Sequence, residues 1–347
     1  MYQSTFQRHS GLWLSVLFIL WLFLPLLSAC VGPYPISPWE TLKISAQILH
    51  IFPVSSLENA NSLLIISQFR LPRAFLALLC GGALAVSGVI LQAVLRNPLA
   101  DPFTLGLSAG AACGASLVIS FASAFSFLSI SLNALTTFAA FVGALIALCG
   151  SLALGWSRGY YQKENIILAG IAIGAFLGAI VTLLKALNEE SVTSIVFWLM
   201  GSLQGRSWEA LPLLLWVLLP ALLLLFLSWR KLDILSLGDE QANSLGLSPA
   251  SSRFLLLCCA SCLTAACVAV CGIIAFVGLV APHILRLLLG PANGPLLLAS
   301  FFGGGIFLLL ADCIARTVLD GGQELPVGVV TALTGGPFFA FLIWRRG

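Results

Sequence analysis

Long apolar runs recur along the whole chain, and few charged residues interrupt them. Ten of these runs reach or approach the ~20 helical residues that cross the roughly 30 Å hydrocarbon core of a bilayer. They lie at residues 11–31, 70–95, 103–121, 132–156, 164–186, 208–229, 251–272, 273–290, 295–317 and 326–344. Apolar and polar positions do not alternate within the runs, as they would in a transmembrane β-strand. The pattern therefore predicts an all-α polytopic membrane protein with ten transmembrane helices in one domain, residues 1–347.

The composition excludes most soluble classes of protein. Hydrophobic residues make up 60% of the chain and charged residues 8%, whereas soluble domains carry about a quarter charged residues. The net charge of +3 is too small for a nucleic-acid-binding surface. The ten cysteines lie mostly inside apolar runs, and we interpret them as small buried side chains. The one-turn spacing of Cys258 and Cys262 is also compatible with a soft metal, but ligand thiols are normally closer together and on loops, so we predict no metal site.

The even number of spans predicts that both termini lie on the same side of the membrane. Placing them in the cytoplasm puts ten Lys and Arg residues inside and six outside, in agreement with the positive-inside rule. The inside group is Arg8, Arg96, Arg158, Lys163, Arg230, Lys231, Arg253, Arg286, Arg345 and Arg346, and the outside group is Lys43, Arg70, Arg73, Lys185, Arg206 and Arg316. In this topology residues 33–69 form an outer loop and residues 230–250 a cytoplasmic loop. Residues 12–29 followed by Cys30 also fit a cleaved signal with a lipid-acceptor cysteine, but we expect them to remain as the first span.

A short internal repeat supports this layout. Residues 85–90 (AVSGVI) are similar to residues 269–274 (AVCGII). The two copies lie in the second and seventh spans, which run in opposite directions because they are five spans apart. We therefore predict an inverted repeat of spans 2–5 and 7–10, an arrangement typical of transporters. The seventh and eighth runs are nearly continuous, and only Gly272 marks a turn between them.

The sequence has no nucleotide-binding motif of its own. A Gly-x-x-x-x-Gly-Lys-Ser/Thr phosphate loop is absent, and so is the His-Glu-x-x-His motif of a metalloprotease. We therefore predict no catalytic residue and no cofactor in this chain. Transport would then be driven by an ion gradient or by ATP that another subunit hydrolyses.

Asp312 is essentially the only acid within the spans, away from their ends. A gradient-driven transporter usually has paired acids or broken helices near the middle of the membrane. An isolated Asp at that depth costs about 2.5–3.5 kcal/mol, and Arg316 lies one helical turn away. We predict an intramembrane ion pair between Asp312 and Arg316, with a proton-relay role for Asp312 as the competing interpretation.

Three polar stretches interrupt the apolar pattern. Arg70 and Arg73 open the second span one turn apart, around a proline that suits a first helical turn. Residues 96–102 (RNPLADP) form a tight turn that two prolines bracket. Residues 232–248 have apolar residues at helical spacing and acids near the start of a short helix. A helix lying on lipid would be rich in Lys and Arg, so this segment is better interpreted as a helix that binds a partner.

These stretches together resemble the FecCD family, the permeases of ABC importers for ferric siderophores, haem and cobalamin. The matching segments are residues 70–111 (beginning RLPRAF), 168–174 (LAGIAIG), 238–247 (GDEQANSLGL), 272–290 (GIIAFVGLVAPHILRLLLG) and 311–339 (beginning ADCIAR). They occur in the family's order and cover most of residues 70–344. The sequence departs from the family pattern at Ile273, where Gly-Pro-Ile is usual.

The resemblance implies a type II ABC importer permease in the bacterial inner membrane. Its expected partners are two ATP-binding cassette subunits on the cytoplasmic face, a second permease subunit (a copy or a homologue) and a periplasmic or lipid-anchored substrate-binding protein. ATP and Mg would be bound by the ATPases. Residues 197–211 resemble ferric-siderophore permeases more than cobalamin permeases, so the expected cargo is a metal chelate, a ferric siderophore in the first place. Haem, cobalamin and molybdate remain alternatives, and a gradient-driven secondary transporter is a further one.

The resemblance also implies roles for individual residues. Arg70, Arg73 and Arg316 match outward arginines that pair with glutamates of the binding protein, whereas snorkelling anchors are the alternative.

Two further groups of residues match the family on the cytoplasmic side. Residues 233–248 match its coupling loop, and the expected ATPase contacts are Asp239, Glu240, Leu245, Gly246 and Arg253. Asn97, Pro98 and Leu99 match its cytoplasmic gate, with a plain helix-capping turn as the alternative.

Overall fold

The computed structural model describes residues 2–48, 60–125, 130–157, 160–161, 163–319 and 321–346. Residues 49–59 of the predicted outer loop and Arg158 of the predicted cytoplasmic group lie outside the described residues.

Ten helices of 13 or more residues account for most of the described chain. They are α1 Tyr2–Ala29, α4 Leu71–Leu95, α5 Leu107–Ser120, α6 Leu132–Gly155, α7 Lys163–Leu187, α9 Ala210–Leu227, α12 Pro249–Cys271, α13 Val277–Leu289, α14 Asn293–Thr317 and α15 Val327–Arg346. Each corresponds to one predicted span, which confirms the all-α polytopic fold. Seven are long and apolar enough to cross a membrane, and α5, α13 and residues Val327–Leu342 of α15 are shorter apolar helices.

Shorter elements occupy the connections. They are α2 Pro38–Ile48, α3 Ala60–Leu64, the π-helical turn η1 Ile65–Arg70, η2 Pro102–Leu105, η3 Ala122–Phe125, η4 Glu189–Ser191, α8 Val192–Leu199, α10 Trp229–Leu237, α11 Asp239–Ser244 and the two-residue strands β1 Trp156–Ser157 and β2 Tyr160–Tyr161. The predicted outer loop 33–69 is therefore partly helical, and from Ala60 it continues without a break into α4. The predicted cytoplasmic loop 230–250 contains two helices, which Gly238 separates.

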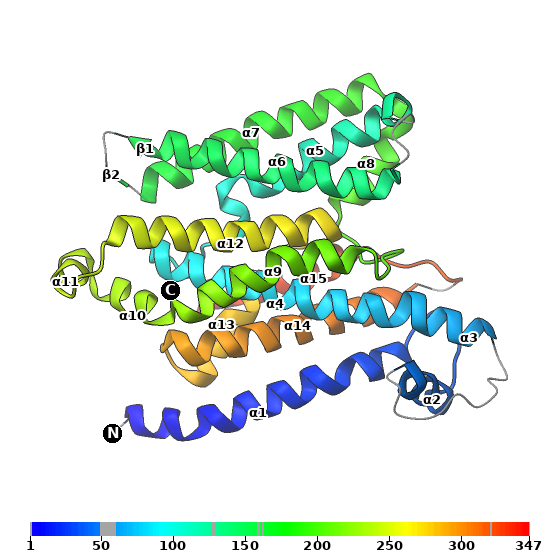
Figure 1. Cartoon of the computed structure of the whole chain (residues 1–347), viewed down its shortest axis with the longest axis horizontal. Helices are drawn as coiled ribbons and strands as arrows, with labels where there is room; N and C mark the ends of the chain where they lie inside the picture. Colours follow the sequence, from blue (N-terminus) through cyan, green and yellow to red (C-terminus); the bar gives the residue numbers. More distant parts are fainter. Residues whose placement is uncertain are drawn as a thin grey trace.

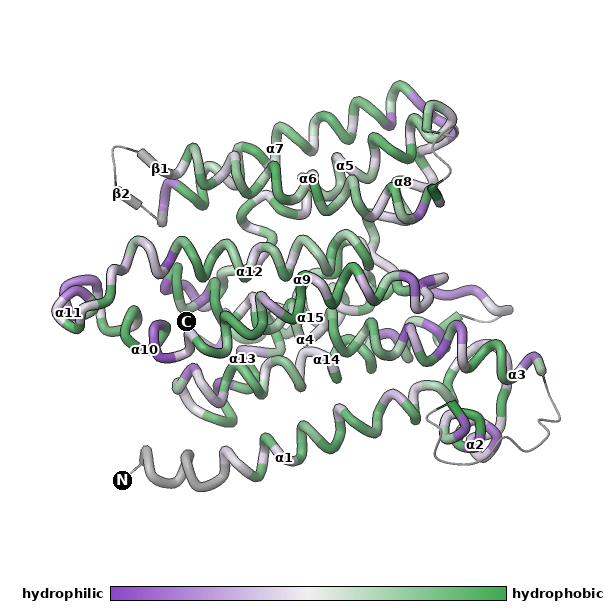
Figure 2. Tube along the Cα trace, viewed as in Figure 1, coloured by the Kyte–Doolittle hydropathy of each residue, from purple (hydrophilic) through white to green (hydrophobic). Residues whose placement is uncertain are grey.

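The long helices run roughly along one direction, and polar residues gather at the two ends of the bundle (Figures 1 and 2). Helices α5, α6, α7 and α8 form a layer on one side, α12 packs between this layer and α4, and α1 lies on the other side against α14. The first residues of α1 and the last of α15 lie at the same end as α10 and α11 (Figure 1), as the even number of spans predicts. We call this the α11 end and the opposite end, which carries α2 and α3, the α3 end.

Helix α4 forms the centre of the bundle. Of its 25 residues 22 are buried, because α1, α12, α13 and α14 all pack against it. Small residues allow this close packing: a Cβ on Gly81 would lie 2.3 Å from the backbone oxygen of Gly304 in α14. A helix that is apolar on every side is stable only when protein or lipid covers every side, and here protein does so.

The two predicted repeats have matching architecture. Helices α4 to α7 have 25, 14, 24 and 25 residues, and helices α12 to α15 have 23, 13, 25 and 20. The short second helix of each repeat follows a residue in the left-handed region, Gly106 (φ 78°) or Phe276 (φ 70°). The first helix of each repeat packs on the third helix of the other repeat: α4 packs on α14, and α12 packs on α6. The matching hexapeptides, however, differ locally: residues 85–90 are helical throughout, whereas α12 ends at Cys271 and Gly272 (φ 71°) turns the chain.

Candidate functional site

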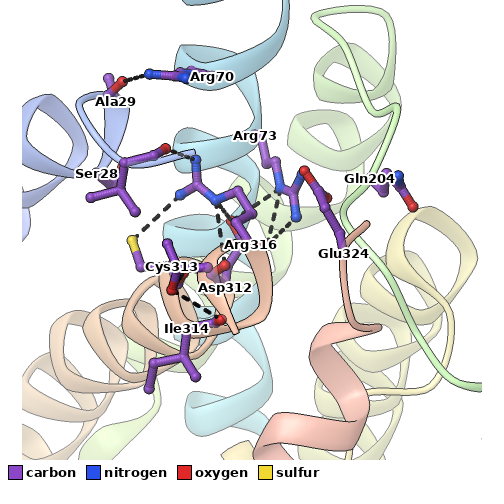
Figure 3. A network of polar contacts seen from close by, with 12 residues as sticks. Ser28, Ala29, Arg70, Arg73, Gln204, Asp312, Cys313, Ile314, Arg316 and Glu324 are labelled. Atoms are coloured by element: carbon purple, nitrogen blue, oxygen red, sulfur yellow. Dashed lines mark hydrogen bonds and ion pairs between the residues drawn. The ribbon is translucent and has the colours of Figure 1, made fainter. Parts of the chain in front are cut away.

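A buried network of charges ties α4 to α14 and to the segment before α15 near the α3 end (Figure 3). Arg73 Nη2 lies 2.8 Å from Asp312 Oδ1, and Arg73 Nη1 lies 2.6 Å from Glu324 Oε2. Arg316 Nε lies 3.1 Å from Asp312 Oδ2, so the predicted ion pair is present. The sequence prediction missed Arg73 as a second partner of Asp312, and it missed Glu324.

The other guanidinium groups at this end hold the end of α1 and the residues that follow it. Arg70 Nη1 donates to Ala29 O at 2.8 Å, and its Nη2 donates to Tyr34 O. Arg316 Nη1 donates to Val31 O at 3.0 Å. The segment after α1 is therefore fixed to the end of η1, just before α4, and to the last turn of α14.

The family resemblance predicts that Arg70, Arg73 and Arg316 point outward. In the structure their exposed fractions are only 5%, 8% and 3%, and acceptors within the chain already bind their guanidinium groups. They are therefore not free surface charges, because desolvated guanidinium groups need partners. All three nevertheless line one cavity of about 360 Å³, which Glu324 also lines.

The predicted gate residues form a tight turn at the α11 end. Arg96 ends α4 in the left-handed region (φ 50°), and Asn97 Oδ1 accepts a hydrogen bond from the Leu99 amide at 2.9 Å. Asn97, Pro98 and Leu99 are exposed. Asp101 Oδ1 accepts from the Phe103 amide at 2.9 Å, so side chains of the turn stabilise both of its halves.

Asp239 joins three segments at the α11 end. It is the first residue of α11, and Arg253 Nη1 from the start of α12 donates to its Oδ2 at 2.8 Å. Arg96 Nη2 donates to Asp239 Oδ1 at 3.0 Å and to Leu235 O at 2.8 Å. The hydrogen bonds from Arg253, together with the charges of Arg253 and Arg96, hold the pKa of the Asp239 carboxyl below its usual value. We call Asp239, Arg96 and Arg253 the Asp239 clamp.

The clamp changes the interpretation of two predicted ATPase contacts. Asp239 and Arg253 bind each other and Arg96, and the Arg253 side chain is only 14% exposed. Glu240 and Leu245 are exposed, and Leu245 is 62% exposed although it is apolar. The Asp239 side chain is 51% exposed, but Arg96 and Arg253 bind it, so Glu240 and Leu245 are the predicted contacts whose side chains are both exposed and free of ion pairs among the described residues.

Gly246 ends α11 in a Schellman motif. The Leu247 amide donates to Ala242 O and the Gly246 amide to Asn243 O, both at 2.9 Å. Gly246 has φ 77°, a conformation in which a residue with a Cβ is strained. Gly246 therefore fixes how the exposed helix returns to the bundle.

The described residues contain no group of three or more His, Cys, Asp or Glu side chains that would hold a metal ion. Two thiols are in contact between α4 and α12, where Cys271 Sγ and Cys80 Sγ lie 3.3 Å apart. The sites described here are therefore ionic and hydrogen-bonded contacts.

The sequence of the chain matches one protein family in comparisons with known proteins. The model of the FecCD transport family matches residues 19–345. A cobalamin import system permease of Halobacterium salinarum is 37% identical over 309 residues, which cover 89% of this chain and 80% of the relative. An Fe(3+)-citrate import system permease of Bacillus subtilis is 37% identical over 340 residues, which cover 97% and 96%.

A solved structure shares the fold. It is described as a metal-chelate type ABC transporter in an inward-facing conformation, and its chain is 32% identical with a TM-score of 0.80, covering 96% of this chain and 98% of that chain. The fold is thus that of a type II ABC importer permease. The chain belongs to the FecCD transport family and is a multi-pass membrane protein with the fold of an ABC transporter permease.

Proposed function

We propose that this chain is the permease subunit of an ABC importer that moves a metal chelate across the bacterial inner membrane. One observation carries the proposal: an apolar helix bundle separates two polar sites. One site is the arginine-lined cavity at the α3 end, and the other is the exposed helix α11 at the opposite end. Within the described residues no side-chain cluster suggests chemistry of the chain's own, and Asp312, the candidate for a proton relay, is bound by two arginines. We therefore assign ATP and Mg binding to separate subunits.

The exposed residues at each end of the bundle suggest which partner binds there. Two ATP-binding cassette subunits would bind the α11 ends of two permease subunits, through Glu240 and Leu245, in the cytoplasm together with both termini. A periplasmic or lipid-anchored binding protein would cover the α3 end, where acidic side chains would reach the cavity that Arg70, Arg73 and Arg316 line.

A second permease subunit, a copy or a homologue, would pack against α7. This helix exposes apolar residues such as Ile171 (59%) and Phe176 (67%). A Cβ on Gly178 would have no neighbour within 4 Å in the single chain. Small residues let membrane helices approach closely, which supports a helix partner at this face.

A ferric chelate is the proposed cargo. The relatives named above are described as importers of cobalamin and of Fe(3+)-citrate, so the family handles more than one chelate. Residues 197–211 support the choice of a ferric siderophore.

Reconstitution into proteoliposomes tests the proposal. Permease together with its ATPases and binding protein is expected to accumulate radioactive ferric chelate only when ATP is enclosed, and a proton uncoupler should leave uptake unchanged. The permease alone should accumulate nothing. Uptake by the permease alone, or uptake that the uncoupler abolishes, would show a gradient-driven transporter instead.

Replacing Asp239 with alanine is expected to uncouple ATP hydrolysis from uptake. The clamp connects α11, which the ATPases would move, to Arg96 beside the gate turn. Its removal should lower chelate uptake per ATP hydrolysed by roughly fivefold or more, while stability changes by less than about 1 kcal/mol because the ion pairs are partly exposed. Uptake and ATP hydrolysis are measured together in the same proteoliposomes.

Two matched variants separate the clamp from an ATPase contact. Glu240→Ala removes the neighbouring exposed acid and is expected to weaken ATPase co-purification, whereas Asp239→Ala should leave it intact. The double variant Arg96→Ala/Asp239→Ala should lose less uptake per ATP than the losses of the two single variants added together, because the two residues share one ion pair. If Asp239→Ala releases the ATPases, Asp239 is itself a contact residue and the clamp has no coupling role.

A further inference from the structure

Arg206 differs from the other arginines near the α3 end in having no bound acceptor. It lies in the connection between α8 and α9 and is half-buried. Its backbone amide donates to Leu203 O at 3.3 Å, but among the described residues its guanidinium makes no hydrogen bond and no ion pair. Arg70, Arg73 and Arg316, in contrast, are bound within the chain. The Arg206 guanidinium, with its five N–H donors and positive charge, is therefore available to a ligand.

Arg206 lines three cavities at this end of the bundle. One is the 360 Å³ cavity that Arg70 and Arg73 also line, and a second, of about 410 Å³, lies between α6 and α9. The third is the largest of the three, at about 600 Å³, and is bounded by α5, α6 and α8. A volume of 600 Å³ lies within the roughly 300–1,000 Å³ range of small-molecule sites.

The 600 Å³ cavity has an unusually polar wall for this chain. Hydroxyl and amide side chains line it, including those of Asn133 and Ser194, and the Ser191 hydroxyl there donates to Asn188 O at 3.0 Å. Trp198 also lines it, with a buried indole N–H that has no hydrogen-bond partner among the described residues. Glu190 lines the same cavity without forming an ion pair with Arg206. The cavity therefore combines the cation of Arg206 with the acid Glu190 and several hydroxyl and amide groups.

We propose that this cavity receives an anionic, oxygen-rich metal chelate at the α3 end, and that Arg206 is its charge contact. The proposal rests on the proposed function, because it takes the α3 end as the side from which cargo enters. A carboxylate matches the planar fork of a guanidinium and accepts two hydrogen bonds from it. The surrounding hydroxyl groups would bind further carboxylate or hydroxyl oxygens of the chelate. A cavity of about 600 Å³ fits a small molecule better than a single side chain of a docked protein.

Equilibrium binding to the assembled transporter, without its binding protein, tests the proposal. The probes are radioactive ferric citrate, which is anionic, and a neutral ferric trihydroxamate. Arg206→Gln is expected to raise the Kd for ferric citrate about tenfold, the equivalent of about 1.4 kcal/mol, and to change the Kd for the neutral probe less than twofold. Arg206→Lys keeps the charge but loses the fork, so its effect should be smaller.

Lys185→Gln is the matched control. Lys185 lies in the last turn of α7 at the same end of the bundle and lines none of the three cavities, so its loss should leave both Kd values unchanged. The proposal is overturned if Arg206→Gln leaves the ferric citrate Kd unchanged, or if the unmodified transporter binds neither probe saturably. It is also overturned if Arg206→Gln weakens only the affinity for the binding protein, which would make Arg206 a docking residue.

Uptake by the complete system distinguishes this inference from the proposed function. If chelate uptake by the unmodified transporter does not require ATP, the proposed function fails. If uptake requires ATP and Arg206→Gln has no charge-dependent effect on binding, only the assignment of the cavity fails.

Discussion

Asp312→Asn is expected to destabilise the protein by about 3–5 kcal/mol, the range found when one partner of a buried ion pair is removed. The Asp312 side chain is fully buried, and those of Arg73 and Arg316 are 9% and 3% exposed. Asparagine has nearly the same shape, but it has no negative charge to offset two desolvated guanidinium groups. Glu324 would still neutralise part of the charge of Arg73, whereas Arg316 has no second acid within the described residues. Thermal and denaturant unfolding of purified protein measures the loss.

Glu209→Gln provides the control for Asp312→Asn. It also removes one negative charge, from the exposed residue just before α9, and should change stability by no more than about 0.5 kcal/mol. Equal stability of the two variants would mean that the buried network contributes nothing. A variant Asp312→Asn that is stable but inactive in uptake would instead support the proton-relay role.

This network shows which part of the site the sequence allowed us to predict. Arg316 lies four residues from Asp312 in one helix, and a spacing of one turn places two side chains on the same face. Arg73 is 239 positions from Asp312, and only the packing of α4 on α14 brings them together. The same holds for Arg96 and Asp239, 143 positions apart. Local spacing therefore predicted one pair, and long-range packing determined the rest.

The helices were predictable for a different reason. A helix that crosses the membrane needs apolar side chains whether they face lipid or the protein core. The hydropathy of the sequence therefore locates every long helix. It cannot detect a change of backbone direction within an apolar segment. The eighth predicted span begins at residue 273, but α13 begins at Val277, because Phe276 adopts a left-handed conformation. The third predicted span begins at residue 103, whereas α5 begins at Leu107 after the left-handed Gly106.

Gly88→Ala is expected to have the second large effect, through the contact between α4 and α13. A Cβ on Gly88 would lie 1.8 Å from the backbone oxygen of Gly278 and 2.6 Å from its carbonyl carbon. Two helix backbones meet at this point, so no side chain can rotate away to make room. Overpacking commonly costs about 1–3 kcal/mol, and a backbone clash belongs at or above the upper end of that range. The same oxygen accepts a hydrogen bond from Gln92 Nε2 at 3.2 Å, and separating the helices would break it.

Gly11→Ala is the control for this second variant. A Cβ on Gly11 in α1 would have no neighbour within 4 Å, and alanine is a better helix former by about 1 kcal/mol, so its stability should stay equal or rise. Unfolding of both variants in the same detergent, together with the yield of folded protein, gives the comparison. If Gly88→Ala is as stable as the unmodified protein, α4 and α13 can separate at no cost. The distance between the two backbones at Gly88 and Gly278 could then change, and α4 and α13 would be free to slide past each other during transport.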